Sequence, residues 1–458
     1  MRKLIFSLII TMVFFSAANV HANLVDTFGI GSRAMALGGA YTANASDPFA
    51  GHYNPAGLTQ IESMTVAFGT AIMAPNLKAR NYTVQKNNEV IMGGPGVNVR
   101  DESDNLLVPH LGFAMPINSK WAFGISAYAP YGLHLKWDRT NTSANPTAFN
   151  SYESWYQRVA VTPAVAYKVN EKLSLGFGVV LGRSESGTYQ NLYDLYQKGI
   201  TGSSHGDLTD DLNYSFNFGV MYKPVEKITL GLTYRSKADA DFSGDLELKN
   251  LSDNEKKLIN DTLCSKEGLH DAHTNNNFKS KIRLEDVNHP AQVQAGIRYE
   301  PHKRVSFEAD IVWTNWSDVK QQTVKIKDKY IQGLLETDEQ VHPRDWVSTR
   351  QVRVGLEYLL TDMFTLRCGF FYDPTPVPDD TFDIVWPDAD KKTYSVGLGV
   401  NLGSWTLDGT FVYISTEKDI ILGGESKNLN HTYGDNARVT ADAEAKIFGY
   451  SLTATYEF

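Results

Sequence analysis

Runs of residues with a period of two recur along most of the chain. Apolar side chains alternate with polar residues or glycine in residues 228–235, 292–299, 305–313, 352–358 and 394–402. An extended strand points successive side chains to opposite faces, so each run has one continuous apolar face. The pattern therefore predicts an all-β fold.

Two all-β architectures fit this alternation. A soluble β-sandwich turns its apolar faces inward, whereas a transmembrane barrel turns them toward lipid. The runs reach about ten residues, the length of a tilted membrane strand. The polar faces carry charges that a water-filled lumen tolerates, such as Arg298, Glu308, Asp310, Arg353 and Glu357. We therefore favour a transmembrane antiparallel β-barrel.

The spacing of the runs indicates the size of the barrel. Counting them gives about 14 strands, and bacterial barrels have even numbers of strands. Short turns alternate with long loops, as periplasmic turns and outer loops do in such barrels. We expect the long loops near residues 73–107, 138–152, 189–212, 243–277, 328–345, 373–390 and 416–438. The last strand ends on Phe458, which resembles the signal read by the barrel assembly machinery.

Composition agrees with a barrel. The 458 residues are 42% hydrophobic, and their mean hydropathy of -0.30 is too low for a helical membrane protein. A barrel needs apolar residues only on its outer face, and the 12% aromatic residues supply interfacial girdles. The formal charge is -9 and no basic cluster is present, so nucleic acid is not an expected partner.

The first residues predict export. Arg2 and Lys3 precede an apolar run at residues 4–15, and Val20-His21-Ala22 forms a small-residue cleavage site. The run is too short to span a bilayer. Residues 1–22 are therefore predicted to be a cleaved signal peptide, and the mature protein is predicted to lie in the bacterial outer membrane.

Residues 28–60 have neither strand alternation nor an amphipathic face. They are rich in Gly, Ala, Ser and Asn, and Asn54-Pro55-Ala56 is a turn signal. Such a segment buries too little apolar surface to fold alone. We expect residues 23–59 to form a plug, or hatch, inside a barrel made by residues 60–458.

The sequence carries only weak signals for a catalytic, metal-binding or cofactor-binding site. The histidines are scattered and no GxSxG or CxxC occurs, so no catalytic residue, metal site or cofactor is predicted. Cys264 and Cys368 are either a disulfide pair or two inert thiols. The chain is predicted not to be an enzyme.

Several motifs resemble the FadL family of hydrophobic-compound transporters. They are the hatch with Asn54-Pro55-Ala56, then WAFGISAYAPYGLHLKW at 121–137, LTYRSKADADF at 232–242, VWTNWS at 312–317 and FYDPTPVP at 371–378. The matches are spread over nearly the whole mature chain in the family's order. They are weakest in the long loops, where the family's ligand specificity lies.

The resemblance implies passive transport of long-chain fatty acids or other hydrophobic compounds across the outer membrane. Ligand would be captured between the outer loops and would leave sideways, after hatch movement, through a kinked third strand. The alternatives are a transporter dedicated to aromatic hydrocarbons, or a general or substrate-specific porin for small polar solutes. The expected partners are the ligand, outer-membrane lipid and lipopolysaccharide, and the assembly machinery, with the protein a monomer.

The third predicted strand contains a break. Proline cannot donate to the ladder and glycine permits a bulge, so Pro130, Tyr131 and Gly132 are predicted to interrupt it. By resemblance, this break is the lateral gate, with Asn54, Pro55 and Ala56 lying against it. The simpler interpretation is an ordinary bulge near a rim.

Two loop helices are also predicted. One carries an aromatic stripe at helical spacing, and the other follows a capping box made by Ser252 and Glu255. Their apolar residues would form a groove for ligand capture or pack together as a lid: Tyr189, Leu192, Tyr193 and Tyr196 in the first helix, and Leu258, Ile259 and Leu263 in the second.

The charged residues have two predicted roles. Most lumen charges are expected to form ion pairs that hold the plug to the wall: Arg235, Arg298, Glu308, Asp310, Arg353, Glu357, Arg367, Glu444 and Lys446. By resemblance, Arg183, Lys320 and Lys325 fall near the family's contacts to the ligand carboxylate. Register points Arg183 outward unless its strand bulges.

Overall fold

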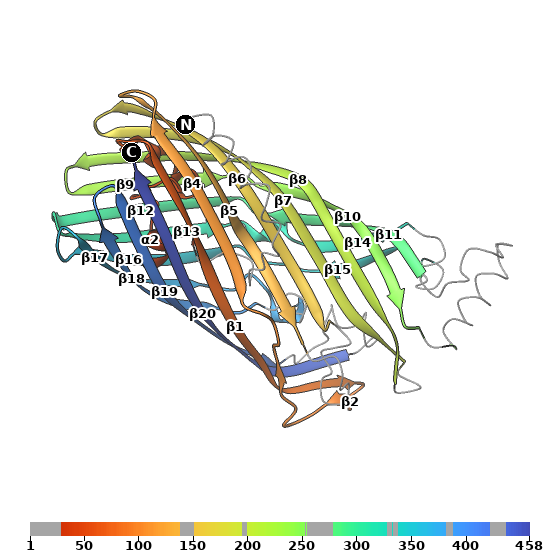
Figure 1. The fold of residues 1–458 in the computed structure, drawn as a ribbon. Coiled ribbons are helices and arrows are strands. Elements are labelled where there is room, and N and C mark those ends of the chain that lie inside the picture. Colours follow the sequence, from red (N-terminus) through yellow and green to blue (C-terminus); the bar gives the residue numbers. More distant parts are fainter. Residues whose placement is uncertain are drawn as a thin grey trace.

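The computed structural model describes residues 29–137, 151–194, 199–251, 253, 278–327, 332, 338–381, 388–421 and 437–458. These residues form an antiparallel barrel of 14 strands with an N-terminal segment inside it (Figure 1). The predicted signal peptide and the predicted helix with Leu258 and Ile259 lie outside the described residues.

The barrel wall is closed by pairing of the first and last strands. Four wall positions are each occupied by two strands in succession, namely β9 with β10, β11 with β12, β13 with β14 and β15 with β16. The strands are β1 (Thr65–Lys86), β2 (Glu89–Gly93), β3 (Val99–Arg100), β4 (Leu106–Pro116), β5 (Trp121–Lys136), β6 (Glu153–Asn170), β7 (Leu173–Asp194), β8 (Gly199–Val225), β9 (Ile228–Arg235), β10 (Ala238–Lys249), β11 (Phe278–His289), β12 (Gln292–His302), β13 (Val305–Thr314), β14 (Gln321–Ile326), β15 (Glu339–Pro343), β16 (Thr349–Leu359), β17 (Phe364–Asp373), β18 (Lys391–Asn401), β19 (Trp405–Ile421) and β20 (Ala437–Glu457).

The helices are short. They are α2 (Ser32–Ala36), α3 (Ala50–Tyr53) and the 3-10 helices η1 (Pro55–Gln60), η3 (Trp316–Asp318) and η4 (Asp379–Thr381). No helix among the described residues is long and apolar enough to cross a bilayer.

The exposure pattern along the strands is the reverse of that in a soluble sheet. In β9, Leu230, Leu232 and Tyr234 are exposed, whereas Thr229 and Thr233 between them are buried. In β13, Phe307 and Ile311 are exposed and the alternating polar residues are buried. The apolar faces therefore point to lipid and the polar faces to the interior, which confirms the barrel and excludes the sandwich.

The two ends of the barrel differ. Thr65 at the start of β1 pairs with Glu457 near the C-terminus, and this end has the short turns. At the opposite end the strands run on as long hairpins (Figure 1). The short-turn end is periplasmic, as in other outer-membrane barrels.

The predicted outer loops near 73–107 and 189–212 are wrong in part, because much of their length is strand, and β19 runs on to Ile421 inside the loop predicted at 416–438. β1 continues to Lys86, and β7 and β8 pair as far as Asp194 and Gly199. At about 3.3 Å per residue, the 27 residues of β8 extend far beyond the bilayer's hydrocarbon core of about 30 Å. Cross-strand hydrogen bonds keep these hairpins extended above the membrane.

The segment before β1 fills the barrel near its periplasmic end. We call residues 29–61 the hatch, and most of its side chains are buried. It is not devoid of regular structure, since it contains α2, α3 and η1. Contacts with many wall strands hold it, and η1 packs on β6, β7 and β8.

Glycines on the inner wall let the hatch approach it closely. A Cβ at Gly176 would lie 2.2 Å from Ala56 N, and one at Gly219 would lie 2.1 Å from Asn54 Oδ1. Both distances are impossible for real atoms, so only glycine fits. Similar close approaches to the hatch occur around the wall at Gly112, Gly124, Gly231, Gly355, Gly369 and Gly397. We call these eight residues the glycine belt.

Cross-strand pairing concentrates the belt. Gly176 lies opposite Gly219 in the β7–β8 pair, and Gly355 lies opposite Gly369 in the β16–β17 pair. Each pair opens a flat patch on which hatch backbone rests.

We predict that Gly176→Val displaces the hatch while the barrel still assembles. The added side chain overlaps hatch backbone, and overpacking of this kind costs about 1–3 kcal/mol or more. Limited proteolysis of the folded protein should then cleave the hatch faster than in the wild type. The matched control is Gly409→Val, because nothing lies within 4 Å of a Cβ built there. Equal cleavage of the two variants would contradict the prediction.

Candidate functional site

A single wall carboxylate anchors one turn of the hatch. Asp310 Oδ2 on β13 accepts hydrogen bonds from Tyr41 N at 3.0 Å, Thr42 N at 2.9 Å and Thr42 Oγ1 at 2.6 Å. Asp310 is 1% exposed. Hydrogen bonds to a buried charged acceptor are strong, so this residue holds the chain between α2 and α3 to the wall.

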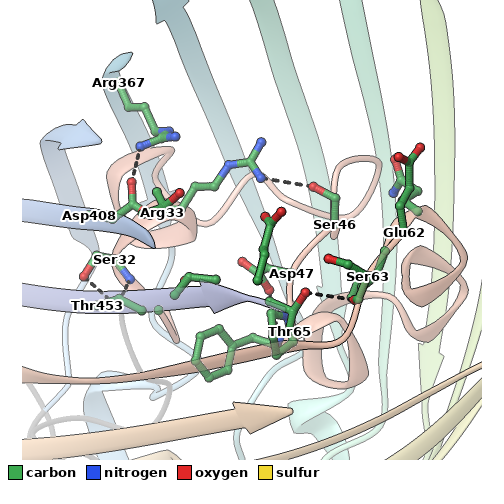
Figure 2. Close-up of a pocket in the computed structure, with 18 residues that line it drawn as sticks. Ser32, Arg33, Ser46, Asp47, Glu62, Ser63, Thr65, Arg367, Asp408 and Thr453 are labelled. Atoms are coloured by element: carbon green, nitrogen blue, oxygen red, sulfur yellow. Dashed lines mark hydrogen bonds and ion pairs between the residues drawn. The ribbon is translucent and has the colours of Figure 1, made fainter. Parts of the chain in front are cut away.

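A chain of ion pairs holds α2. Arg33 Nε lies 3.2 Å from Glu357 Oε2, and the same carboxylate lies 2.7 Å from Arg367 Nε. Arg367 Nη1 in turn lies 2.6 Å from Asp408 Oδ1. Figure 2 shows Arg33 directed toward Ser46 and Arg367 directed toward Asp408. The network ties the hatch to β16, β17 and β19.

The predicted ion pairs are present for Arg298, Glu308, Glu357 and Arg367. Asp310 and Arg353 contact the hatch through hydrogen bonds. Arg298 pairs with Glu308 at 3.3 Å and also donates to Asn44 of the hatch. Arg353 donates to Gly39 O at 3.4 Å. The prediction is wrong for three residues. Glu444 and Lys446 pair with each other, Glu444 also pairs with Arg80, and neither residue contacts the hatch through these bonds. Arg235 contacts the hatch without an acidic partner among the described residues.

Cavities on the periplasmic side of the hatch are polar. One of about 320 Å³ lies between the hatch, β1, β19 and β20, and is lined by Arg33, Asp47, Arg367 and Asp408 among others (Figure 2). Another of about 870 Å³ lies at the periplasmic turns and includes Lys120, Lys168, Lys172 and Lys223. Such linings suit water and ions rather than an alkyl chain.

Buried apolar side chains gather inside the barrel on the other side of the hatch. They come from wall strands all around the barrel and form one buried cluster, which we call the apolar chamber. It includes Met73, Leu106, Tyr131, Leu135, Trp137, Tyr156, Phe242, Leu284, Val287, Trp316, Trp346, Ile414 and Ile447. A hydrophobic compound gains free energy by leaving water for such surroundings.

The wall has a gap beside this chamber. The β4–β5 ladder ends at the pair Leu111–Ala127. Beyond it, β4 pairs with β1 only and β5 pairs with β6 only, as far as Lys136. The segments just before β4 and just after β5 meet where Asp101 bridges Trp137 and where Glu102 N donates to Lys136 O at 2.7 Å. Among the described strands, β5 thus has an unpaired edge between residues 128 and 135.

A bulge lies at the foot of the gap. In the β5–β6 ladder Tyr128 pairs with Ala160 and Tyr131 pairs with Arg158, so two residues of β5 oppose Val159 alone. The extra residue bends the strand away from its neighbour. The predicted interruption is thus present as a bulge at Ala129 and Pro130, whereas Tyr131 and Gly132 keep their pairing with β6.

The hatch residues nearest the gap differ from the predicted ones. Phe49 packs edge-on against His110 of β4, and His52 packs edge-on against Tyr128 of β5 at 4.8 Å between ring centroids. Asn54, Pro55 and Ala56 instead rest on Gly176 of β7 and Gly219 of β8. Asn54 Nδ2 donates to Thr42 O and Val220 O, which fixes that turn. The expectation that the Asn54–Ala56 turn lies against the break is wrong.

Burial affects the titratable groups of the hatch. Desolvation lowers the pKa of His52 well below its usual value, and the charges of Arg235, Arg353 and Arg158 lower it further. The imidazole is therefore neutral at physiological pH. Burial raises the pKa of Asp47, although the charge of Arg33 opposes this shift.

The predicted capture helix at Tyr189 is wrong, because β7 runs to Asp194 and pairs Leu192 and Tyr193 with β8. The long-range ladder overrides the local helical spacing. Tyr189 does lie in an aromatic cluster above the membrane, stacked on His205 at 4.1 Å and edge-on to Trp155 at 4.9 Å. Tyr196 lies outside the described residues.

The structure does not bring the three predicted carboxylate contacts together. Arg183 is exposed on β7 and pairs with Glu185 and Asp211. Lys325 on β14 pairs with Glu285 at 2.9 Å, and Lys320 is exposed just before that strand.

Cys368 is an exposed free thiol on β17.

Arg158 was missed by sequence analysis. It lies on β6 in register with Ser154, Tyr156, Ala160 and Thr162, all of which are buried. That register was the available signal, because an arginine in it must face the interior.

Comparisons with known proteins agree on one family. The family model described as "Outer membrane protein transport protein (OMPP1/FadL/TodX)" matches residues 8–458. A long-chain fatty acid transport protein of Escherichia coli O6:H1 is 25% identical over 83% of each chain. Outer membrane protein P1 of Haemophilus influenzae is 24% identical over the full length of both.

Solved structures show the same fold. The crystal structure of a Pseudomonas aeruginosa FadL homologue has a TM-score of 0.76 at 23% identity, covering 96% of this chain and 100% of that one. The Pseudomonas putida toluene transporter TodX has a TM-score of 0.66 at 14% identity, covering 94% and 99%.

We predict that Asp310→Ala loosens the hatch between α2 and α3. The change leaves three hatch donors without their acceptor, at a cost of about 1–3 kcal/mol for a buried donor left unpaired. Hydrogen exchange at the Tyr41 and Thr42 amides should become faster in the assembled barrel. Asp241→Asn, which alters an exposed pair with Arg283, is the control. Unchanged protection in Asp310→Ala would show that the carboxylate does not hold the hatch.

Proposed function

Because the chain belongs to the OMPP1/FadL/TodX family of outer-membrane transport channels, which are not enzymes, we propose that it carries long-chain fatty acids or other hydrophobic compounds by passive lateral diffusion. The protein lies in the outer membrane as a β-barrel and transports hydrophobic compounds.

The gap between β4 and β5 is the observation that carries the proposal. The hatch fills the barrel, so a ligand in the apolar chamber has no open axial path. The wall beside the chamber lacks its ladder above Leu111 and Ala127. A hydrophobic ligand can leave there into the bilayer without crossing water, and its transfer into lipid is favourable.

The route has four stages. Ligand is captured at the outer hairpins, where Tyr189 lies. It then enters the apolar chamber, and the hatch shifts at Phe49 and His52. It leaves past Pro130, Tyr131 and Gly132. In this proposal, cleavage of a signal peptide of residues 1–22 leaves a plug domain of residues 23–59, which contains most of the hatch, and a barrel of residues 60–458.

Two other assignments are weaker. Relatives include a long-chain fatty acid transport protein and a toluene transporter, so a transporter dedicated to aromatic hydrocarbons would suit the same chamber. A porin for small polar solutes fits less well, because polar solutes gain nothing from an apolar chamber behind a filled lumen. The chamber supports hydrophobic ligands in general.

We predict that deletion of Pro130 blocks transport. The deletion removes the one extra residue of the bulge, so β5 can pair with β6 without a shift and lie closer to β4. Uptake of radiolabelled oleate by cells in which this protein is the only such transporter should fall toward the rate of cells that lack it.

Pro130→Ala is the matched control, since it keeps the extra residue and hence the bulge. Its uptake should remain near that of the wild type. Both proteins must assemble equally, as judged by heat-modifiable migration on gels. Normal oleate uptake by the deletion variant would exclude exit through this gap.

A further inference from the structure

The long hairpins carry a row of three aromatic rings. Trp155 on β6 packs edge-on against Tyr189 on β7, with 4.9 Å between the ring centroids, and Tyr189 stacks on His205 of β8 at 4.1 Å. All three side chains are partly exposed. We call these three residues the aromatic platform.

The platform lies on the outside of the barrel wall. Trp155 alternates with buried residues of β6 and shares its face of that strand with Val159, which is 43% exposed. Trp155 pairs with Gly187, two residues before Tyr189 on β7, and Tyr189 pairs with His205 on β8. Paired residues of adjacent strands point to the same side of a sheet. The three rings therefore share the face that turns toward lipid lower in the wall.

The platform lies above the part of this face that contacts lipid chains. On β7 the exposed apolar side chains end at Leu181, which is 42% exposed, and Arg183, the next residue on this face, forms exposed ion pairs. Gly187 lies six residues beyond Leu181. That is about 20 Å along the strand, or about 15 Å in height at a tilt of about 40°. In the outer leaflet this height is occupied by the sugars of lipopolysaccharide, which extend above its lipid chains and phosphates.

A glycine holds the indole ring of Trp155 against the wall. A Cβ at Gly187 would lie 2.1 Å from Trp155 Cζ2 and 2.4 Å from its Cη2, distances that real atoms do not reach. The ring therefore lies across the bare backbone of Gly187, and any side chain there would push it away. A ring that is already held in place offers a flat apolar surface and loses little entropy when a ligand binds.

Carboxylates surround the rings. Tyr189 Oη donates to Asp207 Oδ1 at 3.0 Å, and Asp207 is exposed. Glu153 lies opposite Tyr189 in the β6–β7 ladder, and Glu247 of β10 lies opposite His205. A sugar ring suits such a surface, because its C–H face packs on an aromatic ring while its hydroxyl groups donate to carboxylates.

The balance of charge favours a neutral sugar. Lys249 Nζ lies 3.4 Å from His205 Nδ1 and 2.9 Å from Glu247 Oε2. Three carboxylates, of Glu153, Asp207 and Glu247, thus accompany one ammonium group. A phosphate would be repelled by this set, whereas a sugar hydroxyl can donate to the carboxylates and accept from the ammonium group.

We propose that the aromatic platform binds neutral sugars in the core oligosaccharide of lipopolysaccharide and so holds one molecule of this glycolipid against β6, β7 and β8. The inference goes beyond transport and does not depend on which ligand is carried. Lipopolysaccharide is the occupant because its sugars lie at the height of the platform when its lipid chains lie against Leu181 and Val159. Lipid contact below also raises the effective concentration of the sugars at the platform, so a weak sugar site is filled.

Binding of two glycolipids with the same lipid part tests the site. Purified full-length protein in an uncharged detergent is titrated with rough-type lipopolysaccharide that has a complete core, and with lipid A prepared from it. Microscale thermophoresis reports binding. The wild type should bind the complete glycolipid about tenfold more tightly than lipid A, a difference of about 1.4 kcal/mol. Trp155→Ala removes the ring over Gly187 and should reduce this preference to about twofold or less.

Tyr189→Ala should act in the same direction, so the proposal stays testable if Trp155→Ala does not assemble. Assembly of each variant is judged by heat-modifiable migration on gels. Tyr214→Ala is the matched control, because Tyr214 is a 61% exposed aromatic residue on β8 outside the platform; it should keep the wild-type preference.

Three results would overturn the sugar site. They are equal affinity of the wild type for the two glycolipids, a wild-type preference in the assembled Trp155 or Tyr189 variant, and loss of the preference in Tyr214→Ala to the same extent. None of them bears on the proposed transport, which oleate uptake tests separately.

Discussion

The fit between the hatch backbone and the glycine belt is the constraint on which the structure depends. A barrel of this size encloses a lumen that must be filled or left to water. Here an irregular segment fills it, and its backbone groups find partners on the wall, as at Asp310 and at Ser395. Side chains at Gly176, Gly219 or Gly369 would push the hatch away from those partners. The space left by the glycines and the hydrogen bonds to the wall therefore hold the hatch in place together.

Filling the lumen divides it into two environments. Below the hatch the cavities are lined by charges such as Arg33, Arg367 and Asp408, whereas above it lies the apolar chamber. A hydrophobic molecule would meet polar surfaces if it continued along the axis, but it meets lipid if it passes between β4 and β5. In the proposed route, the bulge opposite Val159 opens that second path while the rest of the barrel stays paired.

The local sequence pattern predicted the features that depend only on neighbouring residues along the chain. Alternation identified the strands and their lipid face, and Pro130 with Gly132 marked the bulge. The pattern failed where residues that are distant in the sequence determine the local structure. The helical spacing at Tyr189 and Leu192 was overridden by pairing of β7 with β8. Contacts of Asn54 with β8, and the absence of an ion pair at Arg158 and Arg235 among the described residues, depend on strand neighbours that no single run specifies. Inward register alone pointed to Arg158.

Electrical conductance tests the central claim, that the hatch closes the barrel along its axis. Single molecules of the wild-type protein are inserted into planar lipid bilayers in molar salt, and the current is compared with that of a variant lacking residues 29–60. The account predicts little conductance for the wild type and a large, steady conductance once the hatch is removed. A large, steady conductance of the intact protein would contradict it.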